Sequence, residues 1–246
     1  MAIVKIIQGD LIKLFKNGYF QAIGHGCNCK NLMGAGIAAQ ISSQIPEAYA
    51  ADTEFYKRMG GDNHTTAKGI RGHISVAKVT EGYVINMYTQ LLPGRHASYQ
   101  LLQSACEKLN SYCKQRSITR VGLPLVGAGI GGLDVMAAAT IIGLATPDID
   151  VTLVVWTGDE KNWKALEGFT NYGFPRKFDS VVVRTGKDTF AELVGGVWRD
   201  TTFDAEKSNA QWHMGEYAVS FSDTEPAVFL VLDSKDELDK NRHRLY

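Results

Sequence analysis

A glycine-rich stretch runs from His25 to Ala38 and reads HGCNCKNLMGAGIA. A second one runs from Pro124 to Asp134 and reads PLVGAGIGGLD. Each follows an apolar run of strand character and leads into a segment with helical spacing. Main-chain N–H groups of glycine-rich turns, backed by a helix N-terminus, attract phosphate, so two such turns facing one cleft indicate a diphosphate ligand. A nucleotide is therefore the expected class of ligand.

Strands and helices alternate along the chain around these two stretches. A mixed, largely parallel sheet covered by helices on both faces is the α/β architecture that such alternation predicts. Ligands of these sheets bind beyond the carboxyl ends of the strands, where both glycine stretches fall. From periodicity and turn signals we expect strands at 2–8, 19–24, 74–79, 83–88, 119–125 and 151–156, a helical turn at 11–15, and helices at 35–45, 46–56, 98–114 and 136–144.

The pattern changes after Trp156. Polar residues and chain breakers place a boundary between residues 157 and 177, so we assign 1–157 to the α/β domain and 158–246 to a small appendage of unknown role. We expect this appendage to be an α+β extension. It has strand candidates at 180–184, 197–203, 216–221 and 227–232 and a short helix at 189–194.

Composition excludes some classes of function. The 26 basic and 26 acidic residues cancel, so neither general nucleic-acid binding nor attraction to an anionic membrane is expected. No segment approaches transmembrane length, and the first residues have no charged leader followed by a long apolar stretch. We therefore expect a cytoplasmic protein.

The chain has four cysteines, and their spacing fits neither a disulfide framework nor a zinc knuckle. A metal held by Cys27, Cys29 and His25 is the less favoured alternative to reduced, packed thiols. We expect no metal and no cofactor.

These stretches resemble the macrodomains, which are three-layer α/β/α modules that bind ADP-ribose and its derivatives. The similarity covers residues 1 to about 157 and also includes Gly9-Asp10-Leu11 after the first strand. The first stretch is most similar to the ADP-ribose 1''-phosphate phosphatases, and the second is more similar to ADP-ribosyl-glycohydrolases. The resemblance implies that ADP-ribose is bound by Gly9, Asp10, Leu11, Met33, Gly34, Ala35, Gly36, Ile37, Ala38, Val126, Gly127, Ala128, Gly129, Ile130 and Gly131.

By this resemblance Asp10 contacts the adenine amino group and Asn28 faces the distal ribose. A carboxylate accepts from that amine and disfavours guanine, while an amide both donates to and accepts from sugar hydroxyls. The alternatives are that Asp10 caps the helical turn at 11–15 and that Asn28 supports the loop backbone. Tyr88, Thr89 and Gln90 could border the distal ribose, and Tyr172 or Phe174 could stack on adenine.

His25, Asn28 and Asp134 are the candidate catalytic residues. An imidazole near neutral pH can protonate a leaving oxygen or orient a water, although a histidine between glycines is often structural. Asp134 either takes part in catalysis or caps the helix that follows it. Glycohydrolases that act through a lysine adduct carry a lysine in the helix after the first stretch, but residues 39–45 contain none. The acid that those enzymes place in the second stretch falls on Gly131.

We therefore predict hydrolysis of the terminal phosphate of ADP-ribose 1''-phosphate. Water would attack phosphorus while main-chain N–H groups stabilise the developing charge. The first alternative is a mono-ADP-ribosyl hydrolase acting on modified protein or nucleic acid. The second is a reader that binds ADP-ribose without turnover. The expected partners are ADP-ribose, ADP-ribose 1''-phosphate and ADP-ribosylated macromolecules.

Overall fold

The computed structural model describes residues 3–61, 69–164 and 166, together with six strands between residues 180 and 232. The chain divides into two compact units, residues 1–174 and 175–246. The division falls inside the 157–177 segment that the sequence marks as a boundary.

The first unit contains a six-stranded sheet with the order β1-β6-β5-β2-β4-β3. All neighbours are parallel except the antiparallel pair β3 and β4, which confirms the predicted mixed, largely parallel sheet. The strands are β1 (Ile3–Gln8), β2 (Ala22–Asn28), β3 (Ile74–Val79), β4 (Gly82–Gln90), β5 (Arg120–Leu123) and β6 (Asp150–Val155).

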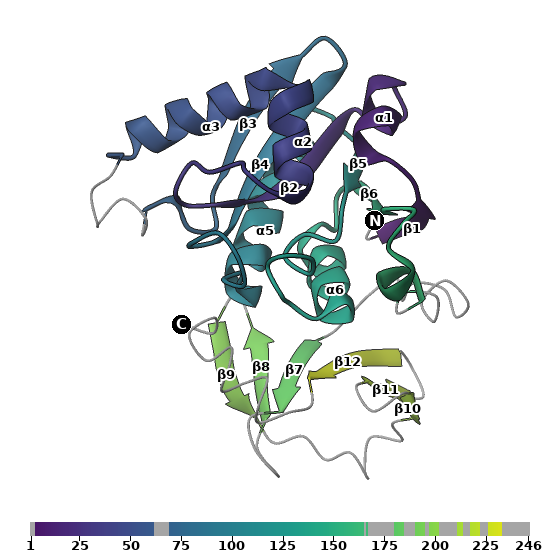
Figure 1. The fold of residues 1–246 in the computed structure, drawn as a ribbon. Coiled ribbons are helices and arrows are strands. Elements are labelled where there is room, and N and C mark those ends of the chain that lie inside the picture. The colour runs from purple at the N-terminus through teal and green to yellow at the C-terminus, as the bar shows by residue number, and fades with distance from the viewer. Residues whose placement is uncertain are drawn as a thin grey trace. The chain divides into compact units, whose positions relative to one another are not determined.

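Helices cover both faces of this sheet (Figure 1). On one face, buried residues of the first three helices pack on β2, β3, β4 and β6 in a single apolar cluster. On the other face lie the last two helices, which pack against each other and bury Leu102, Leu109, Ile141 and Ile142. The helices are α1 (Leu11–Lys16), α2 (Gly36–Gln44), α3 (Pro46–Arg58), α5 (Tyr99–Gln115) and α6 (Val135–Ala145).

Local sequence signals explain where these helices begin. Asp10 caps α1, because its side chain accepts from the Lys13 N–H at 3.0 Å, and Ser98 caps α5 in the same way. Pro46 stands at the first position of α3, where a missing N–H costs nothing. None of the helices described here combines the length and the apolar composition needed to cross a bilayer.

Strand β2 differs from its prediction. It begins at Ala22 rather than Tyr19 and continues to Asn28, so the first glycine stretch starts inside the strand. Side chains alternate between the two faces of a strand. Ile23 packs in the cluster below α2 and α3, whereas a Cβ on Gly24 would lie 2.7 Å from a Leu123 methyl carbon on the opposite face. A side chain at position 24 would therefore force the end of the Leu123 side chain to move.

Strands β2 and β5 pair only over a short distance. Ala22 aligns with Val121 and Ile23 with Gly122, and β5 ends at Leu123. Beyond Ile23 the strand β2 therefore continues beside β4 alone, and the sheet splits between β2 and β5. This split lies at the carboxyl ends of the strands, where open α/β sheets bind ligands.

The second unit contains a six-stranded sheet with the order β10-β11-β12-β7-β8-β9. The helix predicted at 189–194 is wrong, since Phe190–Val194 forms β8 and pairs antiparallel with both β7 and β9. Ala191, Glu192 and Leu193 favour a helix locally, but tertiary pairing overrides a weak propensity. The strands are β7 (Ser180–Arg184), β8 (Phe190–Val194), β9 (Val197–Thr201), β10 (Gln211–His213), β11 (Tyr217–Phe221) and β12 (Pro226–Leu232).

Candidate functional site

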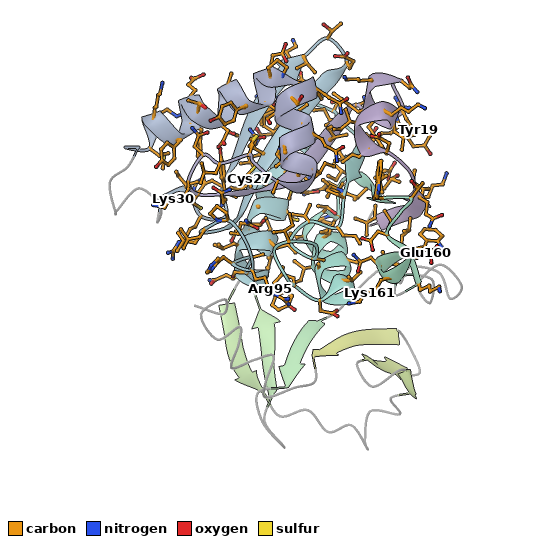
Figure 2. The ribbon with its side chains drawn as sticks, in the orientation of Figure 1. Tyr19, Cys27, Lys30, Arg95, Glu160 and Lys161 are labelled. Carbon is orange, nitrogen blue, oxygen red and sulfur yellow. The ribbon has the colours of Figure 1, made fainter. Side chains whose placement is uncertain are left out.

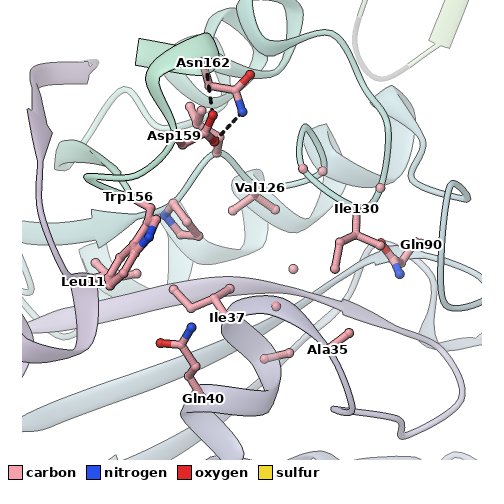
Figure 3. A pocket seen from close by; sticks show the side chains of 18 of the residues that line it. Leu11, Ala35, Ile37, Gln40, Gln90, Val126, Ile130, Trp156, Asp159 and Asn162 are labelled. Carbon is pink, nitrogen blue, oxygen red and sulfur yellow. Dashed lines mark hydrogen bonds between the residues drawn. The ribbon is translucent and has the colours of Figure 1, made fainter.

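A pocket of about 640 Å³ opens at the carboxyl ends of the parallel strands (Figure 3). Its volume is in the range of sites that hold small molecules and cofactors. Both glycine stretches contribute to it, together with the ends of β1, β4 and β6. Of the ligand residues predicted from the sequence, those that line it are Gly9, Asp10, Leu11, Asn28, Gly34, Ala35, Gly36, Ile37, Ala38, Val126, Gly127, Gly129, Ile130 and Gly131.

One end of the pocket joins a carboxylate to an exposed aromatic ring. Asp10 lines this end, and its Oδ1 also caps α1, so the capping interpretation is confirmed and the adenine contact stays a prediction. Trp156 directly follows β6, is 54% exposed, and lies beside Leu11 in Figure 3. Asp159 and Asn162 lie beyond it, and the Asn162 amide donates to Asp159 Oδ2 at 2.7 Å. A flat base fits this combination of ring and carboxylate.

The first loop is built by the side chain of Asn28. Its Oδ1 accepts from the Lys30 N–H at 2.9 Å, and its Nδ2 donates to the Leu32 carbonyl at 2.6 Å. Asn31 takes a positive φ of 53°, which closes the turn. The loop-supporting interpretation of Asn28 is therefore correct, and the residue also lines the pocket.

The second loop is held mainly by its own backbone. The Leu133 N–H donates to the Gly127 carbonyl at 2.9 Å, and the Ala128 N–H donates to the Leu125 carbonyl at 3.0 Å. Gly127 has a φ of +83°, which favours glycine. A Cβ on Gly131 would lie 2.5 Å from the Gly127 carbonyl oxygen, so the loop needs glycine at this position too.

The two loops approach each other across the pocket. Ile130, which is 52% exposed, brings its Cδ1 to 3.2 Å from the point that a Cβ on Gly36 would occupy. Gly36 begins α2 and has a φ of +56°. The main chain of both loops is thus exposed to whatever lies between them, which is the arrangement that phosphate binding requires.

The catalytic role predicted for His25 is corrected by the structure. The side chain is fully buried and lies on the face of β2 toward α3, outside the pocket lining. Burial lowers its pKa to about 4, so the ring is neutral near pH 7. The physical reason is the strand alternation, because His25 and the pocket-lining Gly26 project from opposite faces of β2.

His25 belongs to a buried polar network. Its Nε2 lies 2.8 Å from Asn86 Oδ1, and Asn86 Nδ2 donates to the Ala48 carbonyl and to Ser75 Oγ, both at 2.9 Å. Because both amide donors of Asn86 are used, its oxygen must accept from His25, which assigns the proton to Nε2. The network therefore ties β2, β3, β4 and α3 together.

The same network ends at a buried carboxyl group. Ser75 Oγ lies 2.9 Å from the Tyr88 hydroxyl, which donates to Asp52 Oδ1 at 2.7 Å. Burial raises the pKa of Asp52 to about 6. Tyr88 is thereby turned into the core and does not border the pocket, whereas Gln90 two residues later lines it.

Three further predicted residues lie outside the pocket lining. Met33 is buried in a cluster with Cys27, Cys29 and Phe55. Ala128 belongs to the turn of the second loop. The Asp134 carbonyl accepts from the Ala138 N–H at 3.0 Å, which places Asp134 directly before α6, the position that the capping alternative requires.

All four cysteines are free and buried, and Cys27 is one of them. Figure 2 labels Cys27 together with Lys30 and Arg95, which extend from the loops after β2 and β4.

Sequence reasoning missed several lining residues. The signal for Trp156 was available, since the residue directly after a parallel strand lies at the ligand edge of the sheet. Tyr172 and Phe174 lie outside the described residues. The missed lining residues are Gly26, Leu32, Gln40, Pro93, Gly94, Pro124, Leu125, Val154, Val155, Trp156, Asp159 and Asn162.

Fold and pocket together define a three-layer α/β domain with a pocket at the carboxyl ends of its parallel strands. The sequence profile of the family described as Macro domain matches residues 25–142. An uncharacterised 17.5 kDa protein of Enterobacteria phage T4 is 31% identical over 160 residues, which cover 63% of this chain and 97% of that protein. The chain belongs to the macro domain family.

Other proteins are similar at lower identity. The human ADP-ribose glycohydrolase OARD1 is 23% identical over 155 residues, covering 63% of this chain and 91% of that protein. The structure of Thermosipho africanus DarTG in complex with ADP-ribose superposes with a TM-score of 0.51 at 17% identity, over 63% of this chain and 43% of that one. A Bacteroides thetaiotaomicron protein of unknown function gives a TM-score of 0.52 at 21% identity, over 61% and 96%. These likenesses support the fold.

Proposed function

We propose that residues 1–157 form a module that binds ADP-ribose or an ADP-ribose derivative in this pocket. Adenine lies between Asp10 and Trp156, the diphosphate lies between the two loops, and the distal ribose points toward Asn28 and Gln90. The observation that carries the proposal is the pair of glycine loops facing each other across one pocket, with a carboxylate and an exposed indole at one end.

The polarity of the pocket supports this ligand. Its lining combines main-chain N–H groups of both loops with neutral amides at the end formed by β2 and β4. Such donors bind a diphosphate without needing a strongly basic cleft. The Asp10 carboxylate accepts from the amino group of adenine, whereas guanine presents an oxygen acceptor to it. ADP-ribose is therefore preferred over its guanine counterpart.

Calorimetry with ADP-ribose tests the proposal directly. Replacing Trp156 with alanine removes one face of the base site, and base–aromatic stacking contributes about 1–3 kcal/mol, so affinity falls roughly fivefold to a hundredfold. Tyr49→Ala is the matched control, because Tyr49 is 41% exposed and lies outside the pocket lining. Absence of ADP-ribose binding to the unmodified chain would contradict the proposal, as would equal affinities of the Trp156 and Tyr49 variants.

Hydrolysis of the terminal phosphate of ADP-ribose 1''-phosphate is the second candidate function. Its support is the exposed main chain of both loops, which is suited to stabilising negative charge on a phosphate. The attacking water would act without His25, which is enclosed in the core. Mass spectrometry of the products from ADP-ribose 1''-phosphate, ADP-ribosylated protein and ADP-ribosylated DNA separates three outcomes. These are phosphate release, ADP-ribose release and binding without turnover.

A further inference from the structure

The side chain of Gln40 differs from the other amides of the pocket in its unused hydrogen-bonding capacity. Four amide side chains among the described residues line the pocket. The Asn28 and Gln90 amides each donate to a main-chain carbonyl in the loop after their strand, and the Asn162 amide donates to Asp159. The Gln40 amide forms no hydrogen bond with any of the described residues. Its donors and its acceptor are therefore available to a ligand.

Gln40 belongs to a row of α2 residues that runs from the pocket along α1. It lies one helical turn after Gly36, and residues four positions apart share one face of a helix. The next member of the row, Gln44, is outside the pocket lining and accepts from Lys16 Nζ, at the end of α1, at 3.4 Å. The row thus faces α1, whose first residue is Leu11. This places the Gln40 amide at the end of the pocket that α1 helps to form.

The close view of the pocket shows the same placement. In Figure 3 the Gln40 amide extends from α2 beside Ile37, on the side of the pocket where Leu11 and Trp156 lie. The Gln40 side chain is exposed, so its amide is free to rotate toward a bound molecule. The end of the pocket proposed for adenine thus combines the carboxylate of Asp10, the indole of Trp156 and this amide.

An adenine ring needs a hydrogen-bond donor that Asp10 does not supply. The amino group of adenine is a donor, whereas N1 and N7, the ring nitrogens on either side of it, are acceptors. An ionised carboxylate only accepts, so Asp10 is able to bond to the amino group but to neither ring nitrogen. A glutamine amide supplies N–H donors of the required kind, as it does where proteins read adenine in DNA.

We propose that Gln40 is a specificity-determining residue for the base, with Nε2 donating to a ring nitrogen of adenine beside the amino group. This inference rests on the proposed function for the identity of the ligand. In that arrangement Asp10 and Gln40 read adjacent groups of one base, the first as an acceptor and the second as a donor. Trp156 then provides the stacking surface, which by itself accepts any base.

The test is calorimetry of Gln40→Met with ADP-ribose and with its 1-deaza and 7-deaza analogues, in which C–H replaces one ring nitrogen. Methionine keeps the length of glutamine and removes the amide, so the loss of one hydrogen bond lowers ADP-ribose affinity about threefold to tenfold. One of the two analogues binds the original chain more weakly by a similar factor. For that analogue Gln40→Met has no further effect, because the bond is already absent.

Gln44→Met is the matched control, since it makes the same change on the same helix outside the pocket lining. It retains the original affinity for ADP-ribose. Both side chains are exposed, so both variants keep the Tm of the original chain.

Unchanged ADP-ribose affinity in Gln40→Met overturns the inference. An equal loss for ADP-ribose and for both analogues overturns it too, because Gln40 would then contact another part of the ligand. Failure of the original chain to bind ADP-ribose overturns the proposed function and this inference together, which distinguishes it from the first two results.

Discussion

The two faces of β2 carry opposite kinds of polar chemistry. Toward α3, His25 enters a network in which Asn86, Ser75, Tyr88 and Asp52 bond to one another in sequence. On the opposite face, the strand presents Gly24 and the pocket-lining Gly26, and beside Gly26 lies the Thr89 hydroxyl group, which has no hydrogen-bond partner among the described residues. Neighbouring residues of one motif therefore serve different purposes, because the side chains of a strand alternate.

This contrast separates polar groups that stabilise the fold from polar groups that are available to a ligand. A saturated network has no bonding capacity left for a ligand, and it stabilises one arrangement of the elements that it joins. Groups that lack a partner in the empty protein retain that capacity. We therefore expect damage to the first face to lower stability and damage to the second face to lower affinity.

The largest expected effect comes from Asn86→Leu. This change leaves the His25 N–H without a partner in the core and removes the donors to Ser75 Oγ and to the Ala48 carbonyl, and a buried unpaired group costs about 1–3 kcal/mol. The free energy of unfolding, measured by urea titration, should fall by roughly 3 kcal/mol or more. Ser75→Ala, which removes one member of the network, serves as the milder comparison. A loss for Asn86→Leu no larger than for Ser75→Ala would show that the network is not central to the fold.

A smaller effect is expected from Asp52→Asn, and it depends on pH. Burial raises the pKa of Asp52 to about 6, so the folded chain keeps a proton that the unfolded chain releases between about pH 4 and 6. Stability from this group falls as pH rises through that window. His25 acts oppositely, since burial lowers its pKa to about 4 and its contribution grows as pH rises from 4 toward 6.5.

The two contributions oppose each other in the original chain. Removing Asp52 leaves the His25 contribution alone, so the free energy of unfolding of Asp52→Asn should rise by roughly 2–3 kcal/mol between pH 4 and 6.5. The original chain should change much less over the same interval. Urea titrations at three pH values measure both profiles. Parallel profiles for the two proteins would refute the assignment of these groups.

Gly131→Ala tests the pocket face with a smaller free-energy change. The added Cβ would lie 2.5 Å from the Gly127 carbonyl oxygen and 2.7 Å from Ala97 Cβ, so the second loop must shift. ADP-ribose affinity should fall about tenfold, which corresponds to about 1.4 kcal/mol. Gly129→Ala is a matched control in the same loop, because a Cβ there meets no atom within 4 Å. Equal losses in both variants would mean that loop geometry is not the cause.

The smallest expected effect concerns Cys27, whose Sγ lies 3.7 Å from His25 Nδ1. A thiol beside an imidazole resembles a reactive pair, but burial raises the pKa of Cys27 well above its usual value. Iodoacetamide should therefore leave the native chain unlabelled and modify Cys27 only after unfolding. Rapid labelling of the native chain at this residue would place it on the accessible side of β2.

Periodicity and glycine pattern predicted the sheet, most of its helices and the two loops of the pocket. They did not show the alternation within His25–Asn28, because the strand was expected to end at Gly24 and extends to Asn28. The histidine was therefore assigned to the pocket although it lies in the core. The sequence left two roles open for each of Asn28 and Asp10, because Asn28 supports its loop, Asp10 caps α1, and both residues also line the pocket.

Other differences have tertiary causes. The segment 190–194 has local helix formers but pairs on both sides as β8, and this pairing depends on strands distant in sequence. At Trp156 the apolar run predicts only the end of a strand, although the position of this residue after β6 places it in the pocket lining. Long-range pairing and register carry this information, and neither is visible in a local window of sequence.

The early end of β5 has a consequence for local opening of the sheet. Beyond Ile23, β2 has one strand neighbour, so its main-chain amides on the other edge are shielded from exchange with solvent only by what fills the split. A ligand bound in the split would contact both halves of the sheet at the edge where β2 and β5 are not paired. Ligand binding should therefore lower the deuterium uptake of residues 24–28 without a change in secondary structure.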